Sequence, residues 1–200
     1  MLIPATTDNL AMPLPELPPL RPVLHHAPDV LLRAQAVRVV LLDVDGVLTD
    51  GGLYFGDQGE VIKRFHTLDG HGIKLLQRLG VVPAVVTGRD SAALRNRLHA
   101  LGVQHARFGT EDKAPAAQAL LEELGLDWSQ AAAMGDDWPD LPMLRRAAFA
   151  CAPPGAHPEV LALAHHVTTR GAGAGAVREL CDLIATAHGR YADLLEQAAR

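Results

Sequence analysis

The stretch that decides the fold is Val37-Arg38-Val39-Val40-Leu41-Leu42-Asp43-Val44-Asp45-Gly46. A short apolar run rich in valine is typical of a buried strand in a parallel sheet. Asp43 and Asp45 follow the run two residues apart, so their side chains point to the same side. Ligands of open α/β sheets bind at the carboxyl ends of the strands. Two acids at that edge are unfavourable without positive charge, which indicates a cation, a phosphate group or both.

Strand-like and helix-like segments alternate from residue 37 onward. Strands are expected over residues 39–42, 81–86, 105–108, 131–134, 149–151 and 167–168. Helices are expected over residues 69–79, 91–101, 113–124, 159–164, 176–187 and 191–199. Residues 53–65 alternate around the turn Gly56-Asp57-Gln58-Gly59, which predicts a β-hairpin. This order predicts an α/β fold in three layers, with a parallel sheet between helices on both faces.

Length and composition predict one soluble globular domain with its own core. The chain has 200 residues, of which 48% are hydrophobic and 20% charged. Residues 1–28 are rich in proline and show no clear periodicity, and we expect an extended, flexible tail over residues 1–33. A short helix is expected around residues 29–36, leading into the first strand. Residues 34–200 are expected to form the domain.

Charge and hydropathy exclude several classes of protein. The net charge of −5 argues against a nucleic-acid surface, which needs a basic face. No apolar run approaches the length of a transmembrane helix, and the first residues lack the pattern of a signal peptide. Cys151 and Cys181 have no metal-type spacing and are expected to be reduced thiols. We therefore expect a cytoplasmic protein without a membrane or nucleic-acid partner.

Three more expected strand ends carry polar residues suited to phosphate or metal chemistry. Thr87-Gly88-Arg89 offers hydroxyl, backbone N–H and guanidinium donors before a helix N-terminus, where anions bind well. Lys113 would open a helix, the unfavourable end for a cation, which indicates a nearby anion. Asp136, Asp137 and Asp140 provide the oxygen ligands that Mg²⁺ prefers. Taken singly, each segment is equally compatible with a plain turn, a surface lysine or an acidic helix cap.

Together, DxDG, TGR, an isolated lysine and GDDxxD in this order resemble the haloacid dehalogenase-type phosphatase superfamily, over about residues 37–187. The resemblance implies a Rossmann-like fold and an aspartyl-phosphate intermediate. It implies Asp43 as nucleophile, Asp45 as acid/base, and Thr87 and Lys113 as contacts to the phosphoryl group. Mg²⁺ would be held by Asp43, Asp136 and the Asp45 carbonyl. Asp137 or Asp140 would support the metal or orient Lys113.

No segment is long enough for a large cap domain, so the hairpin is expected in its place. Its apolar residues predict an oligomer interface. Three finer motifs resemble the capless, tetrameric 3-deoxy-D-manno-octulosonate 8-phosphate phosphatases, which act on the route to lipopolysaccharide: Gly46-Val47-Leu48-Thr49-Asp50-Gly51, Leu68-Asp69-Gly70-His71-Gly72-Ile73 and Gly173-Ala174-Gly175-Ala176-Val177-Arg178-Glu179. This resemblance implies a homotetramer whose glycine-rich segment helps to close a neighbour's site.

The substrate is the least determined feature. Candidate contacts are Lys63, Arg64, Asp69, Gly70, His71, Gly88, Arg89 and Arg178. Leu68 stands where many relatives have an arginine able to meet the carboxylate of the sugar acid. A phosphatase of another sugar acid, such as a nonulosonate 9-phosphate, therefore stays open. A non-catalytic oligomerisation module with this fold is a further alternative, although the four motifs retain their catalytic acids and lysine.

Overall fold

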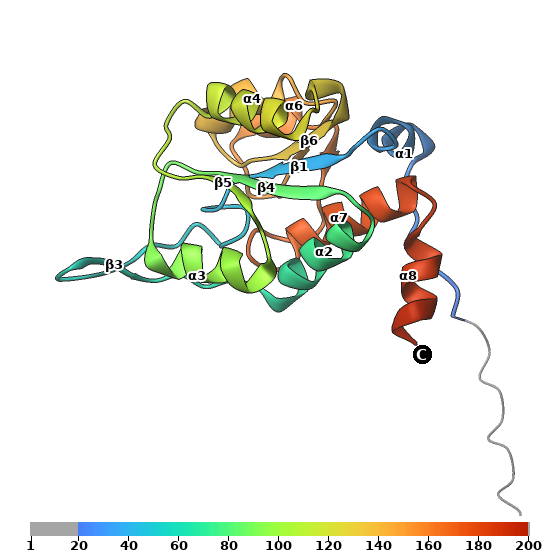
Figure 1. Cartoon of the computed structure of the whole chain (residues 1–200), viewed down its shortest axis with the longest axis horizontal. Helices are drawn as coiled ribbons and strands as arrows, with labels where there is room; N and C mark the ends of the chain where they lie inside the picture. Colours follow the sequence, from blue (N-terminus) through green and yellow to red (C-terminus); the bar gives the residue numbers. More distant parts are fainter. Residues whose placement is uncertain (1–19, 200) are drawn as a thin grey trace, which may run out of the picture.

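A parallel sheet of six strands, in the order β5-β4-β1-β6-β7-β8, forms the middle layer (Figure 1). The chain is described by a computed structural model over residues 20–199. The strands are β1 (Val39–Leu42), β4 (Val82–Val86), β5 (His105–Arg107), β6 (Ala131–Met134), β7 (Phe149–Ala152) and β8 (His166–Val167). The parallel sheet expected from the sequence is confirmed. β1 lies at its centre, where Val39 pairs with Val82 of β4 and with Ala131 of β6.

Helices cover both faces of the sheet, as the alternating sequence pattern predicts. The helical elements are α1 (Pro28–Ala34), α2 (Thr67–Arg78), α3 (Ala92–Leu101), α4 (Lys113–Leu124), η1 (Trp128–Gln130), η2 (Trp138–Asp140), α5 (Leu141–Leu144), α6 (Pro158–Leu163), α7 (Ala176–Ala187) and α8 (Tyr191–Ala198). Figure 1 shows α4 and α6 on one face, and α2, α3 and α7 on the other. The result is the three-layer arrangement of a doubly wound α/β fold.

β1 joins the two halves of the hydrophobic core. Val40 and Leu42 belong to the apolar cluster with α2, α3 and α7, whereas Val39 and Leu41 belong to the cluster with α4, α5 and α6. All four side chains are fully buried. Because both faces of the strand are covered, every position must be apolar. This explains why the run before Asp43 has no polar alternation.

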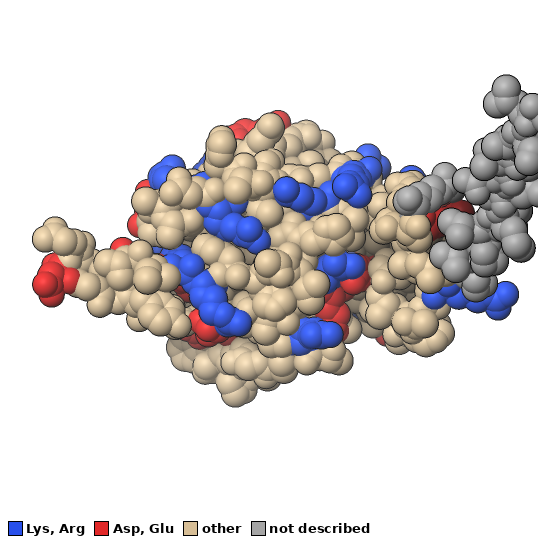
Figure 2. All heavy atoms as spheres, turned by 90° about the horizontal axis from the view of Figure 1, so that it is seen from below, with Lys and Arg blue, Asp and Glu red and all other residues tan. Residues whose placement is uncertain are grey.

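A hairpin takes the place of a cap domain. β2 (Tyr54–Gly56) and β3 (Gly59–Ile62) pair in antiparallel fashion. The hairpin projects from the body of the molecule in Figures 1 and 2, and Lys and Arg are absent from its outer part in Figure 2. Phe55, Val61 and Ile62 are each more than half exposed, at 64%, 55% and 59%. The expected hairpin is thus confirmed, and it exposes large apolar side chains.

The short helix expected around residues 29–36 is present as α1, so the folded unit begins earlier than the boundary expected at residue 34. In α1, Val30 and Leu31 pack against the core cluster beneath α7, and Ala34 is fully buried. Apolar positions within residues 28–33 therefore belong to the domain and not to a tail. Of the tail expected over residues 1–33, residues 1–19 lie outside the described part of the chain.

The glycine-rich segment before α7 packs against the loop that carries the DxD motif. Gly173 has a φ of +57°, and its N–H donates to the Val47 carbonyl at 3.1 Å. A Cβ at Gly173 would lie 2.5 Å from the Asp50 nitrogen. Only glycine fits this backbone contact without displacement. The segment expected to close a neighbour's site thus supports the DxD loop of its own chain.

Gly173→Ala is expected to lower the free energy of unfolding by about 2–4 kcal/mol, because a left-handed backbone and a backbone clash are combined. Gly171 provides a matched control, since its φ is not positive and a Cβ there meets no atom within 4 Å. Urea unfolding of both alanine variants measures the difference. Equal loss of stability in the two variants would contradict the packing described.

Candidate active site

Four adjacent strands bring the four sequence motifs to one edge of the sheet. Asp43 follows β1, Thr87 follows β4, and Asp136 lies one residue beyond Gly135 after β6. Lys113 is the first residue of α4, the helix that follows β5. The Asp43 N–H donates to the Met134 carbonyl at 3.0 Å, which extends the pairing of β1 with β6. Parallel strands in this order place all four side chains at their carboxyl ends, as the fold predicts.

Lys113 lies buried between two carboxylates. Its Nζ is 2.7 Å from Asp43 Oδ1 and 2.6 Å from Asp140 Oδ1. The other oxygen of Asp140 accepts hydrogen bonds from the N–H groups of Asp136 at 2.9 Å and of Asp137 at 3.3 Å. Asp140 therefore orients both Lys113 and the loop after β6. This contact fits the expected role of orienting Lys113, and Asp140 also belongs to the acidic group that could hold a metal ion.

Negative charge dominates the centre of the site. Burial, followed by the charge of Asp140, raises the pKa of Asp43, while Lys113 opposes the shift. Burial and the same Asp140 charge raise the pKa of Asp136 to about 6. Burial would lower the pKa of Lys113, but Asp43 and Asp140 raise it overall. Asp43 and Asp136 thus lie in surroundings that favour the addition of positive charge.

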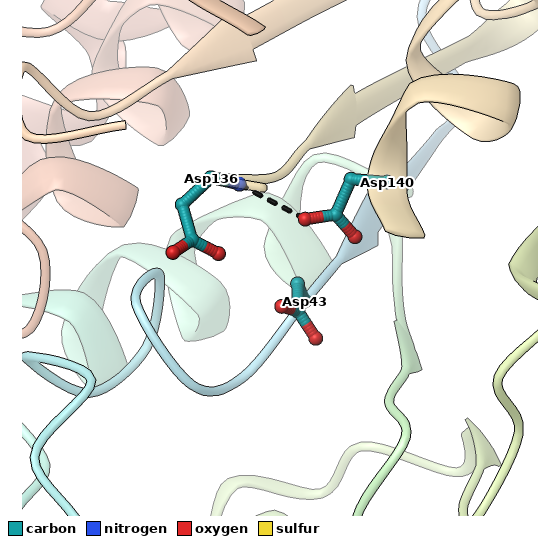
Figure 3. A group of neighbouring side chains, drawn as sticks. All are labelled: Asp43, Asp136 and Asp140. Carbon is teal, nitrogen blue, oxygen red and sulfur yellow. Dashed lines mark hydrogen bonds between the residues drawn. The ribbon is translucent and has the colours of Figure 1, made fainter. Parts of the chain in front are cut away.

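The acids fit a hard divalent cation. Oxygen atoms of Asp43, Asp136 and Asp140 all lie within 4.8 Å of one another (Figure 3). Such an all-oxygen group matches the ligands that Mg²⁺ prefers. Gly46 leaves space for the Asp136 carboxylate, because a Cβ at Gly46 would lie 2.0 Å from Asp136 Oδ2. The carboxylate of Asp137, expected as a ligand, is not part of this group.

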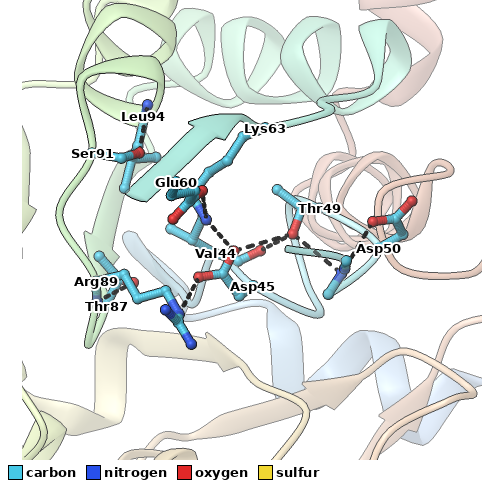
Figure 4. Close-up of polar contacts among 12 residues, drawn as sticks. Val44, Asp45, Thr49, Asp50, Glu60, Lys63, Thr87, Arg89, Ser91 and Leu94 are labelled. Atoms are coloured by element: carbon cyan, nitrogen blue, oxygen red, sulfur yellow. Dashed lines mark hydrogen bonds and ion pairs between the residues drawn. The ribbon is translucent and has the colours of Figure 1, made fainter. Parts of the chain in front are cut away.

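A second set of charges holds Asp45 beside the first (Figure 4). Lys63 of the segment after β3 is buried and contacts Asp45 at 2.5 Å and Glu60 at 2.7 Å. Arg89 Nε lies 3.5 Å from the other oxygen of Asp45. The hairpin arm is therefore tied to the DxD loop by an ion pair that only the folded structure brings together.

The two sets of charges border one cavity of about 490 Å³. Its walls are Asp43, Asp45, Thr87, Gly88, Arg89, Thr110, Glu111, Lys113, Asp136, Asp137, Pro139 and Asp140. A cavity of this size suits a small molecule. The Thr87 backbone is fixed between Arg107 and Thr110, with hydrogen bonds of 3.0 and 3.1 Å. The sequence-predicted residues of all four motifs thus meet in a single small-molecule site.

Other predicted substrate contacts lie elsewhere in this chain. Asp69 is buried and accepts hydrogen bonds from the N–H groups of Gly175 at 3.2 Å and Arg178 at 2.8 Å, so it caps α7. Gly70 packs so closely that a Cβ would lie 2.3 Å from Arg97 Nη2. The remaining three are not among the residues that line the cavity: Arg64, which pairs with Asp50; His71, which is exposed on α2; and Arg178, which pairs with Asp182.

Sequence reasoning did not single out Glu60, Thr110 or Glu111 as site residues. Glu60 reaches the site through Lys63, and Thr110 and Glu111 line the cavity. Thr110 and Glu111 stand just before Lys113, so their position beside a motif was the available signal. Glu60 offered none, because its role depends on how the hairpin folds back onto the DxD loop.

Comparison with known proteins shows the family to which this chain belongs. A profile of haloacid dehalogenase-like hydrolases matches residues 109–180. The 3-deoxy-D-manno-octulosonate 8-phosphate phosphatase KdsC of Yersinia pestis is 42% identical over 164 residues, which cover 82% of this chain and 88% of the relative. The enzyme of the same name from Escherichia coli strain K12 is 38% identical over 162 residues, or 81% and 86% of the two chains.

Solved structures of phosphatases from the same family are similar to this chain. A probable YrbI family phosphatase from Pseudomonas syringae pv. phaseolica 1448a superposes with a TM-score of 0.85 at 42% identity, over 87% of this chain and 99% of the other. The 3-deoxy-D-manno-octulosonate 8-phosphate phosphatase of Moraxella catarrhalis, in complex with magnesium, phosphate and KDO, gives 0.83 at 34% identity, over 88% and 100%. The chain therefore belongs to the haloacid dehalogenase-like hydrolases, within the family of 3-deoxy-D-manno-octulosonate 8-phosphate phosphatases.

Proposed function

We propose that this protein is a Mg²⁺-dependent phosphatase that hydrolyses 3-deoxy-D-manno-octulosonate 8-phosphate, a step in the synthesis of lipopolysaccharide precursors. The observation that carries the proposal is the meeting of Asp43, Asp45, Thr87, Lys113 and Asp136 around one cavity. The relatives named for this activity cover most of the chain. The Moraxella catarrhalis homologue, solved with magnesium, phosphate and KDO, supports the metal and the sugar acid.

Asp43 is proposed as the nucleophile of the first step. Its carboxylate oxygen attacks phosphorus, and the bond from phosphorus to the O8 oxygen of the sugar breaks. Asp45, two residues later on the same loop, gives its proton to the departing oxygen. The sugar acid leaves as a neutral alcohol at that carbon, and the phosphoryl group stays on Asp43 as an acyl phosphate.

Asp45 then serves as base in the second step. It takes a proton from water, whose oxygen attacks the phosphorus of the acyl phosphate. The bond between phosphorus and Asp43 breaks, so phosphate is released and both aspartates return to their starting states. Glu60 and Lys63 hold the Asp45 carboxylate in place for both proton transfers. One loop therefore provides the two groups that alternate in the cycle.

Positive charge around the phosphoryl group is the remaining requirement. Lys113, fixed by Asp140, supplies one cation beside Asp43. Thr87 and the Gly88 N–H are proposed to donate to phosphate oxygens. Asp43, Asp136 and the Asp45 carbonyl are proposed to hold Mg²⁺, with Asp140 nearby. When bound, Mg²⁺ neutralises charge on the phosphate and on the crowded carboxylates.

Assembly and location are further parts of the proposal. The exposed apolar residues of the hairpin support a homotetramer, because apolar patches on an arm favour association. Cys151 and Cys181 are buried free thiols, which supports a reducing compartment such as the cytoplasm. Across residues 20–199, every helix is too short or too polar to span a bilayer.

Purified protein with Mg²⁺ is expected to release phosphate from 3-deoxy-D-manno-octulosonate 8-phosphate, and Asp43→Asn to reduce kcat by at least about 10³-fold, because the nucleophile is lost. Chelation of the metal should stop turnover in the wild type. A malachite green assay measures both. A nonulosonate 9-phosphate serves as the competing substrate, and a higher kcat/KM for it would overturn the substrate assignment while leaving the chemistry intact.

Lys113→Met is expected to lower kcat by about 10²-fold or more and stability by about 3–5 kcal/mol, because it leaves buried carboxylates without their cation. Lys74→Met on the exposed side of α2 is the control and should change neither. Steady-state kinetics and urea unfolding give the two values. Full activity in the Lys113 variant would exclude the proposed contact to the phosphoryl group.

The double variant Phe55→Asp and Ile62→Asp is expected to dissociate the assembly, since each charge would be buried in an apolar interface. Leu32→Asp tests a similarly exposed leucine on α1, 66% accessible, and should leave the assembly unchanged. Multi-angle light scattering gives the mass of each. A wild-type protein that is monomeric at micromolar concentration would disprove the tetramer.

A further inference from the structure

A second cavity, of about 510 Å³, lies away from the phosphoryl site and shares no lining residue with it. It is an open cavity lined by the chain segment before α1, the start of α2, the loop after β8 and the first turns of α7. In Figure 1 the segment before α1 runs beside α7 and α8. Histidines from two distant parts of the sequence meet here, with the rings of His26 and His166 centred 6.3 Å apart.

The carboxylates of this cavity already have partners. Glu179 accepts hydrogen bonds from the Thr169 N–H and hydroxyl at 2.9 and 2.8 Å and from the Arg170 N–H at 3.1 Å, and it lies 3.3 Å from His166 Nε2. Asp182 accepts a hydrogen bond from Arg178 Nε at 2.8 Å. Their negative charge is therefore met from within the protein.

By contrast, three basic side chains of the cavity have nitrogen atoms without a hydrogen-bond partner in the described part of the chain. His26 Nε2 is shielded from solvent and has no hydrogen-bond partner. Arg170 and His25 also line the cavity; both are exposed, and within the described residues their side chains make no hydrogen bond or ion pair. A buried polar atom without a partner is rare and costly. His26 Nε2 is thus the buried atom of this cavity that lacks a partner, and the exposed Arg170 guanidinium beside it is not engaged by another residue of the described chain.

A metal ion does not fit these observations. Among residues 20–199, the only group of three or more His, Cys, Asp or Glu side chains close enough to share one ion is Asp43, Asp136 and Asp140. Unpaired donors instead match an anion with several acceptor oxygens. Leu24 and Leu68 add apolar wall, and the volume far exceeds that of a bare inorganic ion. The complementary ligand has an oxyanion and a carbon body.

From these contacts we propose that the cavity is a binding site for a small organic anion, a carboxylate or a phosphate ester, with Arg170 and His26 as its principal contacts. The proposal does not depend on the catalytic assignment. Its ligand would also explain why the segment before α1 contributes a polar atom to an enclosed position. Nothing in the phosphoryl-transfer steps uses these residues.

Isothermal titration in EDTA tests the site, because without metal the acidic phosphoryl site repels anions. The probes are D-gluconate for carboxylates, glycerol 3-phosphate for phosphate esters, and inorganic phosphate. At least one organic probe should bind with a Kd below about 10 mM, and Arg170→Gln with His26→Gln should weaken it at least about tenfold. Arg170→Lys should retain most binding, and exposed Arg146→Gln should retain all of it.

The identity of the organic probe that binds assigns the oxyanion to a carboxylate or to a phosphate ester. Binding of neither organic probe, tighter binding of inorganic phosphate than of both, or unchanged affinity in the double variant would each overturn the proposal. Circular dichroism monitors the fold of every variant. If the double variant is unfolded, Arg170→Gln alone provides the comparison, since the Glu179 contact uses the backbone N–H of Arg170 and survives the change.

Discussion

The ion pairs of Lys113 are the constraint on which the rest of the site depends. Asp43 and Asp136 must lie at the carboxyl ends of neighbouring strands for a phosphoryl group and a cation to reach both. At that position they are buried, and Asp140 adds further negative charge. A single lysine between Asp43 and Asp140 makes this concentration of charge tolerable. The remaining deficit of positive charge favours the binding of a cation.

The same constraint explains the choice of small residues around the acids. Gly46 is needed because the space beside it is occupied by the carboxylate of Asp136. Gly173 is needed because the segment before α7 presses on the backbone of Thr49 and Asp50. Asp69 in turn fixes the start of α7 through the Gly175 and Arg178 N–H groups. The DxD loop is therefore closely approached by the Asp136 carboxylate at Gly46 and by the Gly173 backbone at Thr49 and Asp50.

The sequence predicted the sheet, the hairpin and the four motifs because each depends on local pattern. Valine-rich runs report strands buried on both faces, and the motif residues follow these runs directly. It did not predict that Asp69 and Arg178 serve α7, or that Glu60 and Lys63 hold Asp45. Those contacts join segments that are separated in the sequence, and no local sequence pattern indicates that these segments meet. Leu68 is similar, because its neighbours in the second cavity come from three other segments.

Chemistry and recognition are thus carried by different parts of the fold. The residues proposed for phosphoryl transfer follow central strands, and their positions are fixed by sheet register. The hairpin and the glycine-rich segment both contact the DxD loop, the first through Lys63 and the second through Gly173. The hairpin also carries an exposed apolar surface, and the glycine-rich segment also lines the second cavity. Neither surface is used in the phosphoryl-transfer steps. Because the proposed catalytic residues follow the central strands, we expect a change at Leu68, which lines the second cavity, to leave their positions unaltered.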